Sequence, residues 1–533
     1  MPIVTTHSVK LAGSEAVPIL VECSVEPGIG IHLVGLADAT VKESLLRVVT
    51  ALQANGFLIP GKKIIINLAP SDLRKEGSGY DLAVALALVA ASEQDGGCLS
   101  DLRDWLVIGE LGLDGSVREV PGTVQAVQAA IGRGCKGVII PKHSGVEVVD
   151  LFSASDIPVY EAASLTDALS IASGKGLIPT IWDGLDYVPD EDRTREEPAW
   201  NGIKGNHGAR RAIEIAAAGG HHLLLVGADG SGKGVFARAL RDLLPPMNRD
   251  EALEVAAVYS AAGKGAMRAA GTEGVGRRPL RSPWHGMSVP ALLGGGPGEN
   301  IMPGEVSLAT RGVLYLDEFA MMPKSLKEGL RGPLEDGQIT ISRLRSKTVL
   351  PTRFQLVAAS APCPCGHYGH GDRCTCTHGQ RAAYLSSLSG PVLDRIDLQA
   401  WITPDDNGLY IKPVPEHDSD TPFQEVAARV AAAREAQRKR FGDGRLNAGM
   451  TAAETERFCH TDGECQKAIE TIIDRLGLSA RAYSRILKIA RTIADLDGRE
   501  DIGPSDIAEA SSYRFLDRRD FIENGNERGT KIA

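Results

Sequence analysis

The chain has 533 residues, of which 43% are hydrophobic and 24% charged, and a formal net charge of -10. This composition is that of a globular protein of three or four domains, and the acidic balance argues against indiscriminate binding to polyanions. No apolar run approaches the ~20 residues of a membrane span, and the first residues lack the charged start and apolar core of a signal peptide. We therefore expect a cytoplasmic protein without membrane contact.

The first 175 residues are predicted to alternate strands and helices. Asp38 can cap a helix, because apolar residues follow it at helical spacing on one face: Val41, Leu45, Val48 and Leu52. The further elements predicted here are strands over 64–68, 107–111 and 138–141 and a helix over 81–91. These patterns favour an α/β fold for this segment.

Three stretches of this segment are specific in sequence: residues 34–38 (VGLAD), 67–78 (NLAPSDLRKEGS) and 109–111 (GEL). They resemble the N-terminal domain of the ComM/YifB family of Mg-chelatase-like AAA+ proteins, which implies a Lon-protease-like (S5) fold for residues 1–175. Lon uses a Ser–Lys dyad, and Ser78 lies about where the serine would fall. The helix expected after Gly122 begins Thr-Val-Gln and offers no lysine to deprotonate that hydroxyl. We therefore expect a structural or partner-binding domain rather than a protease.

A polar, acidic, proline-bearing run over residues 176–200 predicts a linker. A helix over 206–217 and an apolar strand over 223–226 follow it, and the strand meets a glycine-dense turn. Gly227, Gly230, Ser231, Gly232 and Lys233 have the spacing of a phosphate loop, whose backbone N–H groups hold ATP phosphates at a helix N-terminus.

The position after Lys233 departs from the phosphate-loop pattern. A Ser or Thr normally stands there and ligates Mg²⁺ through its hydroxyl, whereas this chain has Gly234. Asp229 adds a carboxylate to the same turn, which disfavours polyphosphate. ATP binding is expected to survive, because backbone amides and Lys233 supply much of it.

A second apolar strand, over 313–316, ends in two acids. Asp317 is predicted to hold Mg²⁺ and Glu318 to polarise the attacking water as general base. A third strand is predicted over 354–360. There the family usually carries Met-Asn where this chain has Ser360-Ala361, and the resemblance makes that Asn a sensor near the γ-phosphate. Ala361 lacks its chemistry, and alternation along the strand turns Ser360 to the other face.

Two further arginines take predicted roles from the resemblance. Arg395, within residues 389–397, matches the arginine-finger segment and would enter the site of a neighbouring subunit; the alternative is a salt bridge with Asp394 or Asp397. Arg481 resembles the second sensor, placed on the nucleotide phosphates. The residues Arg485, Lys488 and Arg491 continue the same helix and are expected on a solvated face.

Four of the nine cysteines fall close together: Cys363, Cys365, Cys374 and Cys376. Two C-x-C arms separated by eight residues provide four thiolates that can surround Zn²⁺ tetrahedrally and order the loop. Three histidines, at 367, 370 and 378, offer replacements for one ligand, and free thiols or redox chemistry are the alternatives to zinc.

Residues 338–350 predict a β-hairpin with a basic tip that carries Arg343, Arg345 and Lys347. In AAA+ rings of this branch such a hairpin faces the central pore, where it would track a DNA backbone without reading sequence; the alternative is an ordinary solvated turn. A glycine-rich loop over 294–298 is a second family-like insertion. Before it, Trp284-His285 stands where the family usually has a His pair.

The resemblance covers nearly the whole chain. It implies an AAA+ α/β core over 201–405, an α-helical lid and tail over 406–533, and a homo-oligomeric ring that is expected to be a hexamer. It also implies DNA binding and ATP-driven branch migration or unwinding during transformation or recombination. The two replacements, Gly234 and Ala361, support an alternative, a pseudo-ATPase that binds nucleotide without efficient hydrolysis. A magnesium-chelatase-like ATPase subunit is a third reading.

Overall fold

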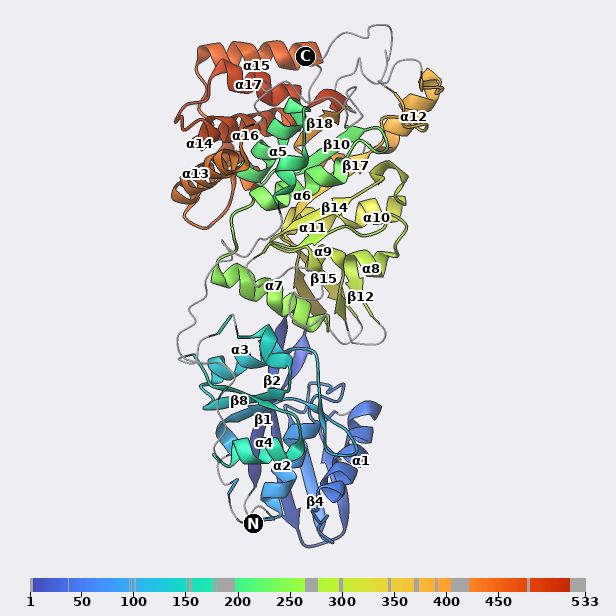
Figure 1. The fold of residues 1–533 in the computed structure, drawn as a ribbon, viewed down its shortest axis with the longest axis vertical. Helices are drawn as coiled ribbons and strands as arrows, with labels where there is room; N and C mark the ends of the chain where they lie inside the picture. Colours follow the sequence, from blue (N-terminus) through green and yellow to red (C-terminus); the bar gives the residue numbers. More distant parts are fainter. Residues whose placement is uncertain are drawn as a thin grey trace.

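The computed structural model describes residues 3–517 except 37, 95, 97, 100–101, 150, 153–155, 176–178, 180–196, 264–276, 297–300, 344–346, 369–372, 389–391, 404–420 and 477–479. Figure 1 shows an elongated molecule with the N-terminal sheet at one end, a second sheet in the middle and the C-terminal helices at the other end. Most of the predicted linker lies outside the described residues. Its last residue, Trp200, is buried and lies 4.5 Å under the guanidinium of Arg210.

The N-terminal part is a mixed seven-stranded sheet in the order β3-β4-β2-β1-β5-β8-β9. Its strands are β1 Val4–Ala12, β2 Glu15–Glu26, β3 Gly30–Val34, β4 Lys63–Ala69, β5 Trp105–Val107, β8 Gly137–Pro141 and β9 Val159–Ala162, with a separate pair β6 Glu110–Leu111 and β7 Val117–Arg118. Its helices are α1 Ala39–Ala54, α2 Asp81–Ala91, α3 Thr123–Arg133 and α4 Leu165–Ala172. The predicted cap is confirmed, since Asp38 accepts a hydrogen bond from Val41 N.

The central part is a five-stranded sheet, all parallel, in the order β11-β14-β17-β10-β18. Its strands are β10 Leu223–Gly227, β11 Leu280–Arg281, β14 Val313–Leu316, β17 Gln355–Ser360 and β18 Leu398–Ile402. The helices around it are α5 His207–Gly219, α6 Lys233–Leu243, α7 Arg249–Ala261, α8 Val289–Leu293, α9 Glu305–Leu308, α10 Lys324–Gly329, α11 Arg331–Asp336 and α12 His378–Leu388. Two short hairpins complete it: β12 Gly294–Gly295 with β13 Met302–Pro303, and β15 Gln338–Ser342 with β16 Lys347–Pro351.

Both faces of the central sheet are covered, as parallel sheets require. Alternate residues of each strand point to opposite faces: Leu223 and Leu225 pack with α5, α6 and the C-terminal helices, whereas Leu224 and Val226 pack with α8, α10 and α12. The predicted fold class, an α/β AAA+ core behind a Lon-like domain, is confirmed.

The C-terminal helices are α13 Phe423–Phe441, α14 Ala452–Phe458, α15 Gly463–Leu476, α16 Ala480–Leu496 and α17 Pro504–Ser512. The expectation of a solvated face on α16 is wrong. Arg491 is 3% exposed and its Nε donates to Asp495 Oδ1 at 3.1 Å, while Lys488 Nζ donates to Ala448 O at 3.2 Å. These cations satisfy carboxylate and carbonyl acceptors inside the helical part, which a one-dimensional helical pattern does not reveal.

Within the described part of the chain, no helix combines the length and apolarity that a bilayer crossing requires.

Candidate nucleotide-binding site

The phosphate loop joins β10 to α6 at the carboxyl edge of the central sheet. Gly230 and Gly232 adopt φ of +78° and +81°, in the left-handed region that favours glycine. Gly227 has a different constraint, since a Cβ there would come within 2.8 Å of Ile402 O and 2.9 Å of Ser231 Oγ. The predicted glycines are therefore the residues that this turn needs.

The loop contains a buried lysine, Lys233, and a buried hydroxyl oxygen, that of the half-buried Ser231. Lys233 Nζ donates to the carbonyl oxygens of Gly227 and Ala228 at 2.9 and 2.8 Å and lies 3.9 Å from Asp229 Oδ1. Burial lowers the pKa of this ammonium, while the carboxylates of Asp229, Asp317 and Glu318 act in the opposite direction. Ser231 Oγ is buried with no hydrogen-bond partner among the described residues, which fits a loop shaped for a polar ligand.

The two acids follow β14 at the same edge of the sheet. Because the strands are parallel, the end of β14, the end of β17 and the phosphate loop after β10 lie next to one another. Asp317 and Glu318 are both exposed, and Asp317 Oδ1 accepts a hydrogen bond from Glu318 N at 2.9 Å. The edge thus brings together one ammonium and two carboxylates, the groups needed to hold phosphate and a divalent cation.

Ala361 lies between these two loops, at the end of β17. Ser360 does not replace the missing amide, because its Oγ donates to Ala361 O at 3.1 Å and lies 3.4 Å from Tyr384 Oη of α12. Alternation predicts this direction correctly: Ser360 faces the helices on the side of the sheet opposite α6.

Three residues near the acids were not singled out as site residues from the sequence. His285 Nδ1 lies 3.0 Å from Glu318 Oε2. Tyr315, two residues before Asp317, packs under the start of α6. Tyr384 lies near enough to Asp229 and Glu318 that, after burial, their charges also raise the pKa of its phenol. Strand alternation could have placed Tyr315 near Asp317 from the sequence. His285 and Tyr384 could not be placed there in this way, because they belong to segments distant along the chain.

The predicted arginines take different positions. Arg395 lies in a 3-10 turn, Leu393–Arg395, and forms an ion pair with Glu335 of α11. Its proposed action on a neighbouring subunit stays a prediction. Arg481 lies in the first turn of α16, and its side chain is outside the described residues.

The basic hairpin forms as β15 and β16. Arg343 Nη2 donates to Gly296 O at 3.2 Å, so the hairpin touches the glycine-rich insertion, and Lys347 is exposed. Arg345 lies outside the described residues. The hairpin also meets the N-terminal part, since a Cβ on Gly13 would come within 2.6 Å of Thr348 Cγ2. The DNA role of these cations stays a prediction.

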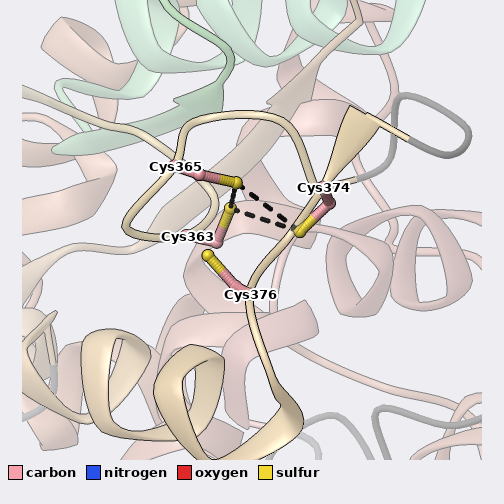
Figure 2. A group of neighbouring side chains, drawn as sticks. All are labelled: Cys363, Cys365, Cys374 and Cys376. Atoms are coloured by element: carbon pink, nitrogen blue, oxygen red, sulfur yellow. Dashed lines mark hydrogen bonds between the residues drawn. The ribbon is translucent and has the colours of Figure 1, made fainter.

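The four clustered cysteines converge. Figure 2 shows Cys363 and Cys365 on one arm facing Cys374 and Cys376 on the other. Three Sγ–Sγ distances are 3.4, 3.8 and 3.7 Å, and all four Sγ atoms lie within 4.8 Å of one another. Four thiolates at ~2.3 Å from a tetrahedral Zn²⁺ are separated by about 3.8 Å, so the cluster fits a structural zinc ion.

Comparison with known protein families matches most of the chain. Residues 21–144 match the family described as subunit ChlI of Mg-chelatase, residues 199–408 match magnesium chelatase, subunit ChlI, and residues 421–514 match its C-terminal part. An archaeal Lon protease from Methanocaldococcus jannaschii is 28% identical over 131 residues, which are 24% of this chain and 19% of that protein.

Full-length relatives give the more specific result. The YifB protein of Escherichia coli is 40% identical over 523 residues, 97% of this chain and 98% of the relative. The competence protein ComM of Haemophilus influenzae is 37% identical over 524 residues, again 97% and 98%, and the Rv2897c protein of Mycobacterium tuberculosis is 37% identical over 517 residues, 95% and 97%. The chain therefore belongs to the ComM/YifB family of Mg-chelatase-like AAA+ proteins.

Proposed function

We propose that this protein binds Mg²⁺–ATP and acts as a ComM-type ring on DNA, in branch migration or unwinding during transformation or recombination. The observation that carries the nucleotide part is the convergence of Lys233, Asp317 and Glu318 at one edge of the central sheet. The DNA part is supported by the similarity to a competence protein over 97% of the chain.

Each residue of the site has a distinct task in this proposal. Backbone N–H groups from Gly230 to Lys233 bind the phosphates, and the Lys233 ammonium leaves its carbonyl acceptors for the outer phosphates. Asp317 holds Mg²⁺, which supplies neutralisation of the phosphate charge when bound. Glu318 polarises the attacking water, and Arg395 of a neighbouring copy in a homo-oligomer stabilises the charge that develops.

The contact with DNA is assigned to the basic hairpin. Arg343, Arg345 and Lys347 carry three cations on one short segment, and the adjacent insertion around Gly296 meets the hairpin through Arg343. In a ring of identical subunits, which the family resemblance makes a hexamer, the hairpins together would follow a phosphate backbone.

A second function is favoured by two specific residues. Gly234 and Ala361 both lack side-chain groups that normally act near the γ-phosphate, which supports a pseudo-ATPase that binds nucleotide as a regulatory or scaffold subunit. A magnesium-chelatase-like ATPase subunit is a weaker third candidate, based on the family matches alone.

An ATPase assay with and without single-stranded DNA separates the first two functions. For the motor, we expect Mg²⁺-dependent turnover that DNA stimulates and that Lys233→Ala abolishes. Wild-type turnover equal to that of Lys233→Ala would contradict the motor. The Gly234→Thr/Ala361→Asn double variant is the matched reference, and turnover of the wild type equal to that variant would contradict the pseudo-ATPase.

A further inference from the structure

The space beside Gly234 is bounded by one aromatic side chain. A Cβ placed on Gly234 would have three nearest atoms, all of Tyr315: Cε1 at 3.8 Å, Cζ at 3.9 Å and the hydroxyl oxygen Oη at 3.9 Å. These are ordinary contact distances, so a small side chain would fit at position 234 without displacing the ring. The tip of the phenol thus adjoins the place where other phosphate loops carry their Ser or Thr.

Strand alternation directs the phenol to this place. Val313 and Tyr315 of β14 point to the face of the sheet covered by α5 and α6, whereas Leu314 and Leu316 point to the opposite face. Asp317 comes two residues after Tyr315, so in an extended backbone its side chain lies on the same face of the sheet. A hydroxyl and the predicted metal-binding carboxylate are therefore presented on the same side, under the first turn of α6.

The Tyr315 hydroxyl is buried and unsatisfied. The residue is 6% exposed, and its Oη makes no hydrogen bond of good geometry among the described residues, although the Asp317 carboxylate lies close to it. A buried hydroxyl without a hydrogen bond destabilises the folded state, and such groups are rare unless they serve a ligand or a function. Like the side chain of Ser or Thr, the phenol offers a hydroxyl oxygen.

We propose that Tyr315 replaces the hydroxyl missing at Gly234 and, together with Asp317, supplies an oxygen ligand to the divalent cation of the bound nucleotide. Hard divalent cations such as Mg²⁺ take oxygen ligands, so the phenol is chemically suited to this task. The inference rests on the proposed nucleotide binding. In this arrangement the hydroxyl that binds the metal comes from strand β14 instead of from position 234 of the phosphate loop. The side-chain amide missing at position 361 has no such replacement.

The test is a Mg²⁺ titration of binding to a fluorescent, non-hydrolysable ATP analogue. Tyr315→Phe keeps the ring and removes only the hydroxyl, and Gly234→Ser returns a hydroxyl to the loop. For Tyr315→Phe, we expect half-saturation at about tenfold more Mg²⁺, as for loss of one hydroxyl contact, and unchanged analogue affinity in EDTA. The double variant Tyr315→Phe/Gly234→Ser should return to within about twofold of the wild type.

Three results would overturn the inference. The first is an unchanged Mg²⁺ half-saturation in Tyr315→Phe, and the second is a change that persists in EDTA or is not rescued by Gly234→Ser. The third is a fall of several degrees in the melting temperature of nucleotide-free Tyr315→Phe, because the hydroxyl would then have a structural partner. A folded wild type that binds no analogue at any Mg²⁺ concentration would overturn the proposed nucleotide function and this inference with it.

Discussion

Glu318 is held by a residue 33 positions earlier in the chain, since His285 Nδ1 lies 3.0 Å from Glu318 Oε2. The backbone of Glu318 has φ of +49°, in the left-handed region that non-glycine residues seldom adopt. Such conformations persist where the surroundings fix them, and they cluster at functional sites. His285 is therefore a candidate positioning residue, which acts on the water through the Glu318 carboxylate.

Replacing His285 with Ala tests this role. Glu318 is 57% exposed on its side chain, so without the imidazole its carboxylate is free to swing into solvent. Under the proposed ATPase activity, we expect kcat to fall by about tenfold, a part of what a general base contributes, and KM for ATP to change little. His285→Asn keeps a hydrogen-bond donor and should retain most of the rate. A rise in kcat for His285→Ala would contradict positioning.

At the scale of elements, the cysteine loop joins β17 to α12 and lies against the phosphate loop. A Cβ on Gly366, next to Cys365, would come within 3.4 Å of Asp229 Oδ2. Metal binding at the four thiols would fix the ends of both arms, so it would also fix the wall of the nucleotide site.

Disrupting the cysteine cluster should therefore affect metal content and nucleotide binding together. We expect purified protein to contain about one zinc per chain and Cys374→Ser to lose most of it. The affinity of Cys374→Ser for the ATP analogue should weaken by about fivefold, or ~1 kcal/mol. Cys98→Ser, at an exposed cysteine elsewhere, is the matched control and should change neither. Elemental analysis that finds no zinc in the wild type would exclude the proposed metal.

The elements themselves were largely predictable from local signals. The apolar runs before the phosphate loop and before Asp317 became β10 and β14, and the Asp38 cap and the basic hairpin formed as expected. Local patterns did not reveal which side chains meet across the fold. His285 contacts Glu318, 33 residues later in the chain, and Arg485 contacts Asp397, 88 residues earlier. Helix and strand periodicity relates only residues a few positions apart, so it could not predict either pair.

At the scale of the molecule, α7 joins the N-terminal part to the AAA+ core. In Figure 1 it lies between the two sheets, and its residues Val255 and Tyr259 share one apolar cluster with Val124 and Val127 of α3. Gln125 Nε2 of α3 also donates to Ala257 O at 2.6 Å. The helix α3, where the resemblance to Lon would place a lysine, is thus packed against α7 of the AAA+ core. The structural role of the Lon-like domain stays a prediction.

The helical lid is anchored to the same core through a buried carboxylate. Asp397 Oδ2 lies 2.9 Å from His221 Nδ1, and its Oδ1 lies 3.4 Å from Arg485 Nε of α16. His221 Nε2 lies 2.9 Å from Thr492 Oγ1, also in α16. The residues before β10, the turn before β18 and the lid are therefore held by one polar network, close to the strand that carries the phosphate loop.

This network predicts how the anchor depends on pH. Burial alone would raise the pKa of Asp397, but the hydrogen bond and charge of His221 and the charge of Arg485 outweigh it and lower the pKa to about 2. Because the folded value lies below the ordinary value of about 3.9, the stabilisation is complete above pH ~4 and is lost as the pH falls towards 2. The ionised Asp397 carboxylate contributes roughly 2–3 kcal/mol to the free energy of unfolding above this pH range.

Asp397→Asn should therefore melt well below the wild type at pH 6, and the gap between their melting temperatures should narrow as the pH falls from 4 towards 2. The matched control is Asp497→Asn, which removes an exposed ion pair with Arg499 of the same helical part and a longer one, at 3.8 Å, with Arg211 of α5. A surface pair of this kind contributes about 0–1 kcal/mol, so its variant should melt close to the wild type at every pH. A gap for Asp397→Asn that stays constant across this range would show that the carboxylate is held by packing rather than by its charge.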